Sequence, residues 1–334
     1  MKALVIHPAF GLENLAVVDR PDPTPGEGQI LVRVRAASLN YRDLLLAKGQ
    51  YNPKLQFPRV LGSDAAGEVV AVGEGVTRFR AGDRVANSFM PHWEDGPITD
   101  AAAKSTLGSD RDGVFAELVA VDERAAVPVP EHLSYEEAAT LPCAAVTAWN
   151  ALTTAGTGPG TTVLLQGTGG VSIFALQFAK ALGGRALITS SSDDKLARAA
   201  ALGADAGVNY RTNPDWEKWA RQQTGGSGVD VVVEVGGAGT LERSLKAVKT
   251  GGHVALIGVL AGAGAVNPLP ILMKAVRVQG VFVGSRAMFE DMNRVIAEKG
   301  IRPVIDRVFP FADAPAAFRH LESGAHFGKV VLSV

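Results

Sequence analysis

The sequence predicts an α/β protein in which a doubly wound parallel sheet is inserted into a β-rich domain. Three observations predict it. An apolar run of strand length at 162–165 stops at a cluster of glycines, and helical spacing follows at 173–182. Apolar strands alternate with helices from about residue 125 onward, whereas short strands separated by turns precede that point. After about residue 290 the alternation stops, so the chain is expected to re-enter its first domain.

Length and composition limit the classes of function. The chain has 334 residues, 47% of them hydrophobic, and a formal net charge of -1, which is typical of a two-domain globular protein without a surface for nucleic acid. No apolar run approaches the roughly 20 residues of a membrane span, and Met1 opens a predicted strand rather than a signal peptide. Cys143 is the single cysteine, which excludes an internal disulfide and favours a cytoplasmic location.

Residues 1–124 have the pattern of a small, barrel-like β domain. Runs of apolar or β-branched residues at 3–6, 29–37, 65–72 and 115–121 are separated by turns rich in Pro, Gly and Asp. A polar segment with little periodicity lies at 90–113. It is long for a loop in a compact domain, so we expect it to be functional or mobile.

Residues 125–289 predict the parallel sheet. Ser134 and Glu137 form a capping box at a helix start. The strands that follow are apolar throughout, as expected for a parallel sheet covered on both faces; they lie at 162–165, 186–190, 207–210, 229–235, 253–259 and 278–283. Six such strands fit a dinucleotide-binding fold, whose ligand lies beyond the carboxyl ends of the strands. A helix at 291–299 and a strand at 329–334 then close the first domain.

The turn after the first of these strands is suited to a pyrophosphate. Gly167 and Gly169 allow a tight turn and the close approach of backbone amides. The helix that follows supplies unpaired N–H groups and a partial positive charge. Ser172 stands at the third position of the Gly-x-Gly-x-x-Gly pattern, a departure that keeps a small residue for helix–strand packing.

The second strand ends in three hydroxyl residues where an NAD-binding unit carries an acidic residue for the ribose 2′-OH. Ser190, Ser191 and Ser192 with Lys195 could hold a 2′-phosphate, so we expect NADP(H) as the cofactor, provided that the two aspartates at 193 and 194 point away. The alternative is that the serines cap the next helix, for which Ser192 is well suited. The two roles are compatible.

A resemblance covers nearly the whole chain, and eight motifs carry it. They are Asn40-Tyr-Arg-Asp43, Gly62-Ser-Asp-Ala-Ala-Gly67, Gly73-Glu-Gly-Val76, Gly82-Asp-Arg-Val85, Thr147-Ala-Trp149, Gly167-Thr-Gly-Gly-Val171, Leu202-Gly-Ala-Asp205 and Gly328-Lys-Val-Val-Leu332. In this order they resemble the medium-chain dehydrogenase/reductase superfamily, and within it the zinc-free quinone oxidoreductase-like or alcohol dehydrogenase-like branch. Leu45 departs from the tyrosine that quinone oxidoreductases often carry there. The resemblance implies a GroES-like catalytic domain at 1–124 and 290–334 around a Rossmann domain at 125–289.

The same resemblance places the three protein ligands of a catalytic zinc ion on Asn40, Ser63 and Cys143, with Asp64 in place of the neighbouring glutamate. An amide, a hydroxyl and one thiol match a zinc site poorly. Residues 90–113, which correspond to the loop with four structural cysteines in the zinc enzymes, contain none. We therefore expect no metal, and we expect Cys143 to be a small buried residue without a reactive role.

The resemblance and the strand ends together mark the expected cofactor contacts. Thr147 is expected to contact the nicotinamide ring and Lys329 to reach the cofactor. The other expected contacts lie in the glycine turn and at the ends of the strands: Gly167, Thr168, Gly169, Gly170, Val171, Ser190, Ser191, Lys195, Tyr210, Gly258, Val259 and Val283.

Loss of zinc restricts the chemistry. Hydride delivery to a ketone forms a strongly basic alkoxide that a Lewis acid stabilises, whereas a quinone or an enone gives a far less basic oxyanion. Hydrogen-bond donors can stabilise the latter, and the candidates are Asn40, Tyr41, Tyr51, Ser63 and Asp64. Each has a structural alternative: Asn40 as a cap or turn residue, and Tyr51 as the cover of a loop. Asp43 is expected to support a helix start and Arg42 to lie on the surface.

The sequence thus predicts a zinc-independent, NADPH-dependent reductase of quinones or α,β-unsaturated carbonyls. The alternatives are an alcohol dehydrogenase and a non-catalytic, crystallin-like NADPH-binding protein. The last predicted strand is an apolar sheet edge over 281–283, and superfamily relatives dimerise through the equivalent strand. We therefore expect a homodimer through residues 278–284.

Overall fold

The computed structural model describes residues 1–258 and 264–334. The chain forms two compact units, which we call the split unit (Met1–Val146 and Gly284–Val334) and the inserted unit (Thr147–Val283). This division differs from the predicted boundaries near residues 124 and 290. The first boundary lies later because β8 (Ala126–Pro128) pairs with β6 (Arg84–Asn87), which places the segment after residue 124 in the sheet of the split unit.

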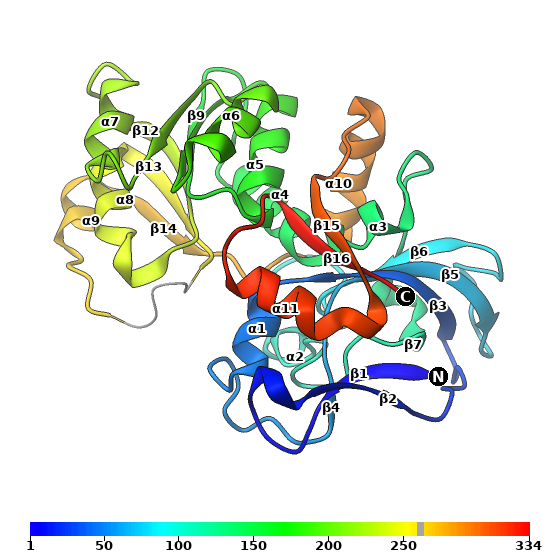
Figure 1. Ribbon diagram of the computed structural model, residues 1–334. Helices are drawn as coiled ribbons and strands as arrows, with labels where there is room; N and C mark the ends of the chain where they lie inside the picture. The colour runs from blue at the N-terminus through cyan, green and yellow to red at the C-terminus, as the bar shows by residue number, and fades with distance from the viewer. Residues whose placement is uncertain (259–263) are drawn as a thin grey trace. The chain divides into compact units, whose positions relative to one another are not determined.

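The split unit contains two sheets (Figure 1). The smaller has the order β2-β1-β4, and the larger has the order β15-β16-β3-β5-β6-β8 with β7 paired to β3. Besides β6 and β8, the strands are β1 (Lys2–Ile6), β2 (Leu15–Asp19), β3 (Gln29–Leu39), β4 (Arg59–Val60), β5 (Ala65–Val72), β7 (Leu118–Asp122), β15 (Ile305–Pro310) and β16 (Lys329–Ser333). β16 pairs antiparallel with β3, so the end of the chain lies beside the segment that leads to Asn40.

Helices of the split unit pack on these sheets. They are α1 (Tyr41–Ala47), α2 (Asp100–Ala103), α3 (Tyr135–Ala138), a π-helix at Leu141–Ala145, α10 (Arg286–Lys299) and α11 (Ala314–Glu322), with short 3₁₀ turns at Leu12–Asn14, Glu123–Ala125 and Phe311–Asp313. α11 packs against α1 and β16, and Leu44, Phe318 and Leu332 from these three elements lie in one buried core. The capping box of Ser134 and Glu137 at the start of α3 is present as predicted.

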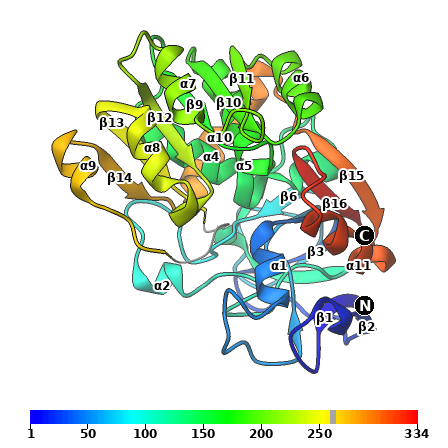
Figure 2. The same cartoon turned by 60° about the vertical axis from the view of Figure 1, so that its left-hand side comes forward.

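The inserted unit is a parallel sheet of six strands in the order β11-β10-β9-β12-β13-β14. The strands are β9 (Thr162–Leu165), β10 (Arg185–Ser190), β11 (Ala206–Asn209), β12 (Val229–Glu234), β13 (Val248–Leu256) and β14 (Arg277–Gly280). The helices are α4 (Val146–Thr154), α5 (Gly170–Ala181), α6 (Asp193–Ala201), α7 (Trp216–Gln222), a 3₁₀ turn at Gly237–Gly239, α8 (Leu241–Ala247) and α9 (Leu269–Met273). The strand order reverses between β9 and β12, which puts α5 and α8 on opposite faces (Figure 2). The doubly wound architecture predicted from the sequence is confirmed.

The final strand is shorter than predicted. β14 ends at Gly280, although we expected a strand to 283. Val281 and Val283 turn inward and are buried, and Val283 has a φ of 59°, which no extended strand contains. Only Phe282 of the three is exposed.

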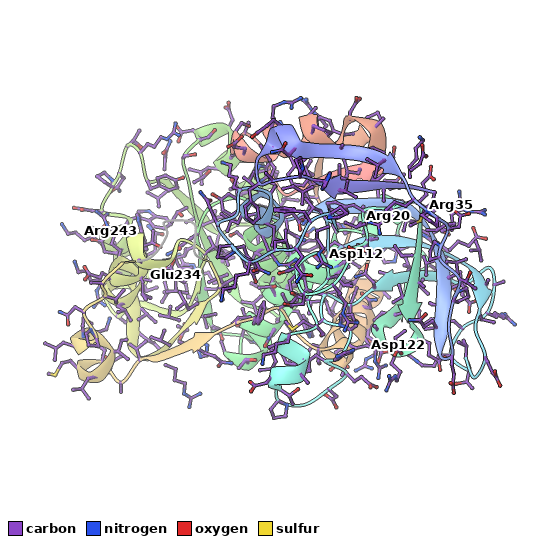
Figure 3. The ribbon with its side chains drawn as sticks, turned by 90° about the horizontal axis from the view of Figure 1, so that it is seen from below. Arg20, Arg35, Asp112, Asp122, Glu234 and Arg243 are labelled. Atoms are coloured by element: carbon purple, nitrogen blue, oxygen red, sulfur yellow. The ribbon has the colours of Figure 1, made fainter. Side chains whose placement is uncertain are left out.

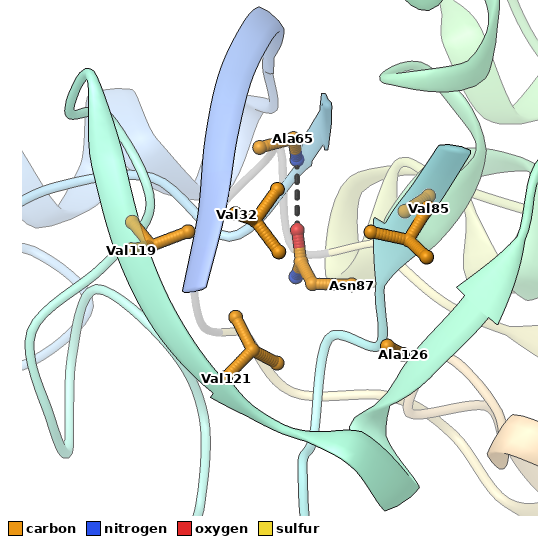
Figure 4. Close-up of a pocket in the computed structure, with 8 residues that line it drawn as sticks. Val32, Ala65, Val85, Asn87, Val119, Val121 and Ala126 are labelled. Carbon is orange, nitrogen blue, oxygen red and sulfur yellow. Dashed lines mark hydrogen bonds between the residues drawn. The ribbon is translucent and has the colours of Figure 1, made fainter. Parts of the chain in front are cut away.

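A small cavity lies inside the larger sheet of the split unit (Figure 4). Valine and alanine side chains line it, with Asn87 as the polar residue. The Asn87 side chain is already engaged, because its Oδ1 accepts the Ala65 N–H at 2.9 Å and its Nδ2 donates to Ser63 O at 2.7 Å. The cavity volume is about 10 Å³, at the lower limit for a single water molecule, so it is a packing space rather than a ligand site.

Across the described residues, no helix combines the length and apolar character needed to cross a membrane.

Candidate active site

The glycine turn after β9 begins in the left-handed region. Gly167 has a φ of 72°, and a Cβ added there would meet open space, so only the backbone requires glycine. Gly169 is the N-cap of α5, and Gly170 and Val171 begin the helix. The departure at Ser172 has a structural role, because its Oγ donates to Gln166 O at 2.6 Å and ties the helix to the end of β9.

Two side chains link the ends of β9 and β12, where the strand order reverses. Glu234, labelled in Figure 3, is fully buried at the end of β12, and Gln166 Nε2 donates to its Oε2 at 2.8 Å. Its Oε1 accepts the backbone N–H groups of Gly236 and Gly237 at 2.8 and 3.0 Å. The hydroxyl of Ser244 also donates to the carboxylate. Sequence reasoning did not select this residue, although a charged residue that ends an apolar strand was the available signal.

Gly258 lies two residues after the end of β13, where another part of the backbone passes close to it. A Cβ at this position would lie 1.6 Å from Val235 O. The chain therefore passes next to the end of β12 without room for any side chain. Val259, a predicted cofactor contact, lies outside the described residues.

The serines after β10 differ in exposure. Ser190 is buried, and its Oγ lies 3.4 Å from the Thr168 hydroxyl. This contact supports the glycine turn. Ser191 is half-buried, and Ser192 caps α6 by accepting the Lys195 N–H, as the alternative role predicted. Asp193 turns toward β11, where Asn209 Nδ2 donates to it at 2.9 Å.

The remaining predicted contacts of the inserted unit lie at strand and helix ends. Tyr210 follows β11 and is exposed, whereas Thr147 is buried in α4. Val283 is a β-branched residue with positive φ, which is an outlier, and Asn150 Nδ2 donates to its carbonyl oxygen at 2.7 Å. Strained residues of this kind cluster at ligand sites. Asn150 was not selected from the sequence.

In the split unit, four chain segments bring a polar cluster together. It consists of Asn40 at the start of α1, Ser63 and Asp64 before β5, Cys143 in the π-helix and Lys329 at the start of β16. Lys329 Nζ donates to Leu39 O at 2.7 Å and to Asn40 Oδ1 at 2.6 Å. Asn40 Nδ2 donates to Ser63 Oγ at 3.3 Å, and Ser63 Oγ donates to Asp64 Oδ1 at 2.7 Å. The Cys143 N–H donates to Asp64 Oδ2 at 3.1 Å.

Both acids near this cluster are fully buried. Burial raises the pKa of Asp64, and the Lys329 ammonium and the hydrogen bonds that the carboxylate accepts oppose that rise. Burial raises the pKa of Asp43 to about 6, which Arg42 and the Asn40 N–H partly offset. The Asn40 N–H donates to Asp43 Oδ2 at 2.8 Å, which completes a capping box on α1. The predicted helix-start role of Asp43 is therefore confirmed.

The expectation that Arg42 lies on the surface is wrong. Its side chain is 9% exposed, and its guanidinium carbon lies 5.1 Å from the Tyr51 ring centre and 4.7 Å from that of Phe89. It donates to Leu107 O at 2.9 Å and to Thr106 Oγ1 at 3.2 Å. Through these hydrogen bonds Arg42 connects α1 to the long segment at 90–113. Tyr41 and Tyr51 remain partly exposed.

The donor atoms of the cluster fit a zinc ion poorly. Asn40 Oδ1 is bonded to the Lys329 ammonium, and the Ser63 hydroxyl gives its hydrogen to Asp64. Cys143 is half-buried rather than buried as we expected. Desolvation, together with the Asp64 carboxyl, raises the pKa of its thiol. One thiol beside an amide and a hydroxyl is a poor set of zinc ligands. Across the described residues, no group of three or more His, Cys, Asp or Glu side chains is arranged to hold a metal ion.

Comparison with known families agrees with this architecture. The model of the alcohol dehydrogenase GroES-like domain matches residues 26–131, and that of the zinc-binding dehydrogenases matches residues 170–298. The chain is 46% identical over 315 residues to a zinc-type alcohol dehydrogenase-like protein of Schizosaccharomyces pombe, which covers 92% of this chain and 91% of the relative. The chain is a medium-chain dehydrogenase/reductase. The enzyme is therefore an oxidoreductase, as predicted.

Other relatives of this dehydrogenase/reductase differ in substrate and cofactor. An acryloyl-coenzyme A reductase of Metallosphaera sedula is 31% identical over 350 residues and covers the full length of both chains. The structure of an NAD-dependent alcohol dehydrogenase has a TM-score of 0.91 at 38% identity, with full coverage of both chains. The Escherichia coli quinone oxidoreductase complexed with NADPH has a TM-score of 0.86 at 28% identity, also with full coverage. The two solved structures belong to enzymes of NAD and NADPH, which supports a nicotinamide cofactor and a small-molecule substrate for this chain.

Proposed function

We propose that this oxidoreductase transfers hydride from NADPH to a quinone or an α,β-unsaturated carbonyl without using zinc. The observation that carries the proposal is the chemistry of the three residues at the positions where the resemblance to the superfamily places zinc ligands. Here an amide, a hydroxyl and a single thiol stand there, and the amide and hydroxyl are hydrogen-bonded to a buried lysine and a buried carboxylate. The site therefore offers hydrogen-bond donors rather than a Lewis acid.

The electronic demand of the substrate fits such a site. When a bound nicotinamide supplies hydride to an enone, the β-carbon gains a C–H bond and the displaced electron pair moves to the carbonyl oxygen as an enolate. A quinone gives a phenolate-like oxygen in the same way. Either oxyanion is weakly basic, so neutral donors and a nearby cation can stabilise it, and solvent can supply the final proton.

Among the five predicted catalytic residues, the hydrogen bonds support a division into donors and supporting residues. The hydrogen of Ser63 is given to Asp64, and both Asp64 oxygens accept hydrogen bonds, so these two residues hold the cluster together. Asn40 has one N–H that is not given to Ser63. Asn40, Tyr41 and Tyr51 are therefore the donors that we assign to the substrate oxygen.

The preference for NADPH rests on the end of β10. No acidic side chain stands at positions 190–192, and Asp193, which would repel a 2′-phosphate, is bonded to Asn209. We assign the phosphate to Ser191 and Lys195, with Ser190 as support of the turn. The E. coli quinone oxidoreductase with bound NADPH is in keeping with this assignment, while the NAD-dependent relative favours the alternative.

A direct assay tests the proposed function. NADPH consumption with a simple quinone and a simple enone is measured with and without a chelator, beside elemental analysis of the purified protein. We expect turnover that the chelator leaves unchanged and no stoichiometric zinc. Alcohol oxidation that the chelator abolishes, with about one zinc per chain, would instead establish the alcohol dehydrogenase function that other relatives suggest.

We further propose a homodimer through residues 278–284. β14 is the last strand of the six-stranded sheet, three of its four residues are exposed, and Phe282 next to it is 38% exposed. Pairing with a twofold copy would extend the sheet and satisfy its backbone groups. Ultracentrifugation at micromolar concentration should give the mass of at least two chains, and Val281→Pro should reduce it. A single-chain mass that Val281→Pro leaves unchanged would exclude this edge as an interface.

A further inference from the structure

Lys329 occupies an unusual place for a lysine. Its side chain is 3% exposed, and β16 carries it next to the end of β3, where Val330 is opposite Leu39. The two acceptors of its ammonium, Leu39 O and Asn40 Oδ1, lie almost 300 residues away in the sequence, with separations of 290 and 289 positions. Burying an ammonium is costly unless its hydrogen bonds and a nearby anion compensate it. The Asp64 carboxyl interacts electrostatically with this ammonium, which lowers the pKa of Asp64 against the effect of burial.

The lysine determines which way the Asn40 amide faces. An amide can present either its oxygen or its NH₂ group to a neighbour, but an ammonium only donates. Asn40 Oδ1 must therefore face Lys329, and Asn40 Nδ2 must face Ser63. Ser63 then accepts from Asn40 and donates to Asp64. Every hydrogen bond in the series points away from Lys329 toward the carboxylate.

This series of hydrogen bonds leaves donor hydrogens unused on Asn40 and Lys329. At ordinary hydrogen-bond distances within the described part of the chain, Asn40 donates one of its two Nδ2 hydrogens, to Ser63, and Lys329 donates two of its three. The Asn40 amide also lies close enough to the Asp64 carboxyl to lower the pKa of Asp64, at a longer range than these bonds. The single hydroxyl hydrogen of Ser63 is used. If the amide were reversed, its oxygen would face Ser63 and the site would lose the Asn40 donor.

We propose that Lys329 is a positioning residue that holds the Asn40 amide with its NH₂ group directed as a donor, so that the remaining Asn40 N–H binds the oxyanion formed by hydride transfer. This inference rests on the proposed function. Asn40 gives up no proton in the step: the substrate carbon gains the hydride, the oxygen takes the displaced electron pair, and solvent supplies the proton. Lys329 acts on the developing anion only through Asn40.

Four variants separate this role from a structural one. Lys329→Met removes the donor, Lys329→Arg keeps a cationic donor, and Asn40→Leu removes the amide at similar volume. Lys48→Met is the matched control, because Lys48 is a surface lysine of the same unit paired with Glu322. We expect Lys329→Met and Asn40→Leu each to lower kcat by roughly 10²-fold, the usual effect of losing one oxyanion donor. Lys329→Arg should recover most of that loss, and Lys48→Met should leave kcat unchanged.

The double variant Lys329→Met with Asn40→Leu tests whether the lysine acts through the amide. We expect it to be no slower than either single variant, because both remove the same donor. Losses that multiply would overturn the proposal. NADPH affinity should be unchanged in Lys329→Met. A weaker NADPH affinity with unchanged kcat would overturn the proposal in favour of a cofactor contact for Lys329.

A spectroscopic measurement needs no turnover. The visible absorbance of 4-nitrophenolate reports the ionisation of 4-nitrophenol bound to the NADP⁺-loaded enzyme. Wild type should lower the pKa of the bound phenol, and Lys329→Met should lose about 2 pH units of that effect, the equivalent of the 10²-fold loss in kcat. If Lys329→Met fails to fold, Asn40→Leu must show the same loss, and an unchanged phenol pKa there overturns the proposal. A wild type that reduces neither quinone nor enone refutes the proposed function, while this measurement still decides the role of Lys329.

Discussion

The inserted unit presents mainly backbone at its candidate cofactor positions, whereas the split unit presents side chains at its polar cluster. Gly167, Gly169 and Gly258 lie in turns that directly follow strands, and their fit depends on φ angles and on the distance between backbones. Asn40, Asp64 and Lys329 come from segments far apart in sequence and depend on buried charges and directed hydrogen bonds. The first kind of site should therefore fail through steric clashes and the second through changes in charge and protonation.

The largest expected effect is steric and belongs to the inserted unit. Gly258→Ala would place a Cβ 1.6 Å from Val235 O, so a backbone segment has to move, and we expect a loss of at least ~3 kcal/mol in the free energy of unfolding together with weaker NADPH binding. Chemical denaturation and calorimetry measure the two. The matched control is Gly280→Ala, where a Cβ meets nothing within 4 Å. Equal stability of the two variants would show that backbone approach does not define this site.

The next effect is electrostatic and belongs to the split unit. The pKa of Asp43 rises from its ordinary 3.8 to about 6 in the folded protein. The folded state thus holds the proton more tightly than the unfolded state, and this group's contribution to stability is lost as pH rises from about 4 through 6. A rise of about 2 pH units corresponds to ~3 kcal/mol.

Asp43→Asn should remove that part of the pH dependence. Unfolding free energies of wild type and variant are measured at pH values from about 4 to 7, and wild type should lose ~3 kcal/mol relative to the variant across the interval. Asp100→Asn, at an exposed acid in the first turn of α2, serves as the control and should follow wild type. A constant difference between wild type and Asp43→Asn at all pH values would contradict the assignment.

A side-chain contact in the inserted unit is expected to have a smaller effect, on the choice of cofactor. If Lys195 binds the 2′-phosphate, Lys195→Ala should weaken NADPH binding by ~1–3 kcal/mol and leave NADH binding unchanged. Lys180→Ala removes a lysine of the same unit that is paired with Asp205, and it should affect neither cofactor. Equal losses for NADPH and NADH in calorimetry would show that Lys195 does not select the cofactor.

The smallest expected effect concerns backbone strain at the end of the inserted unit. Val283→Gly relieves a positive φ that a β-branched residue rarely adopts, but it also removes a buried side chain. These contributions of opposite sign should leave the unfolding free energy within ~1 kcal/mol of wild type. Asn150→Ala, which deletes the hydrogen bond to Val283 O, should be more destabilising than Val283→Gly. The reverse order would mean that the strain is not held by Asn150.

Local sequence patterns were sufficient for the order of the six strands of the inserted unit and for helices α5, α6 and α8, whereas α4, α7 and α9 were not predicted. Apolar runs, glycine turns and the caps at Ser134 and Ser192 act over a few residues, so the sequence displays them directly. The residue types at Asn40, Ser63 and Cys143 can also be read from the sequence, and the zinc-free branch that they favour stays a prediction.

Tertiary structure decided what those residues contact. Nothing near position 329 in the sequence indicates that its ammonium reaches Asn40, since the pairing of β16 with β3 creates that contact. The burial of Arg42 and the inward turn of Val281 and Val283 likewise depend on segments remote in the chain. Short-range periodicity records which elements form, whereas burial and hydrogen-bond direction arise only when distant segments pack together.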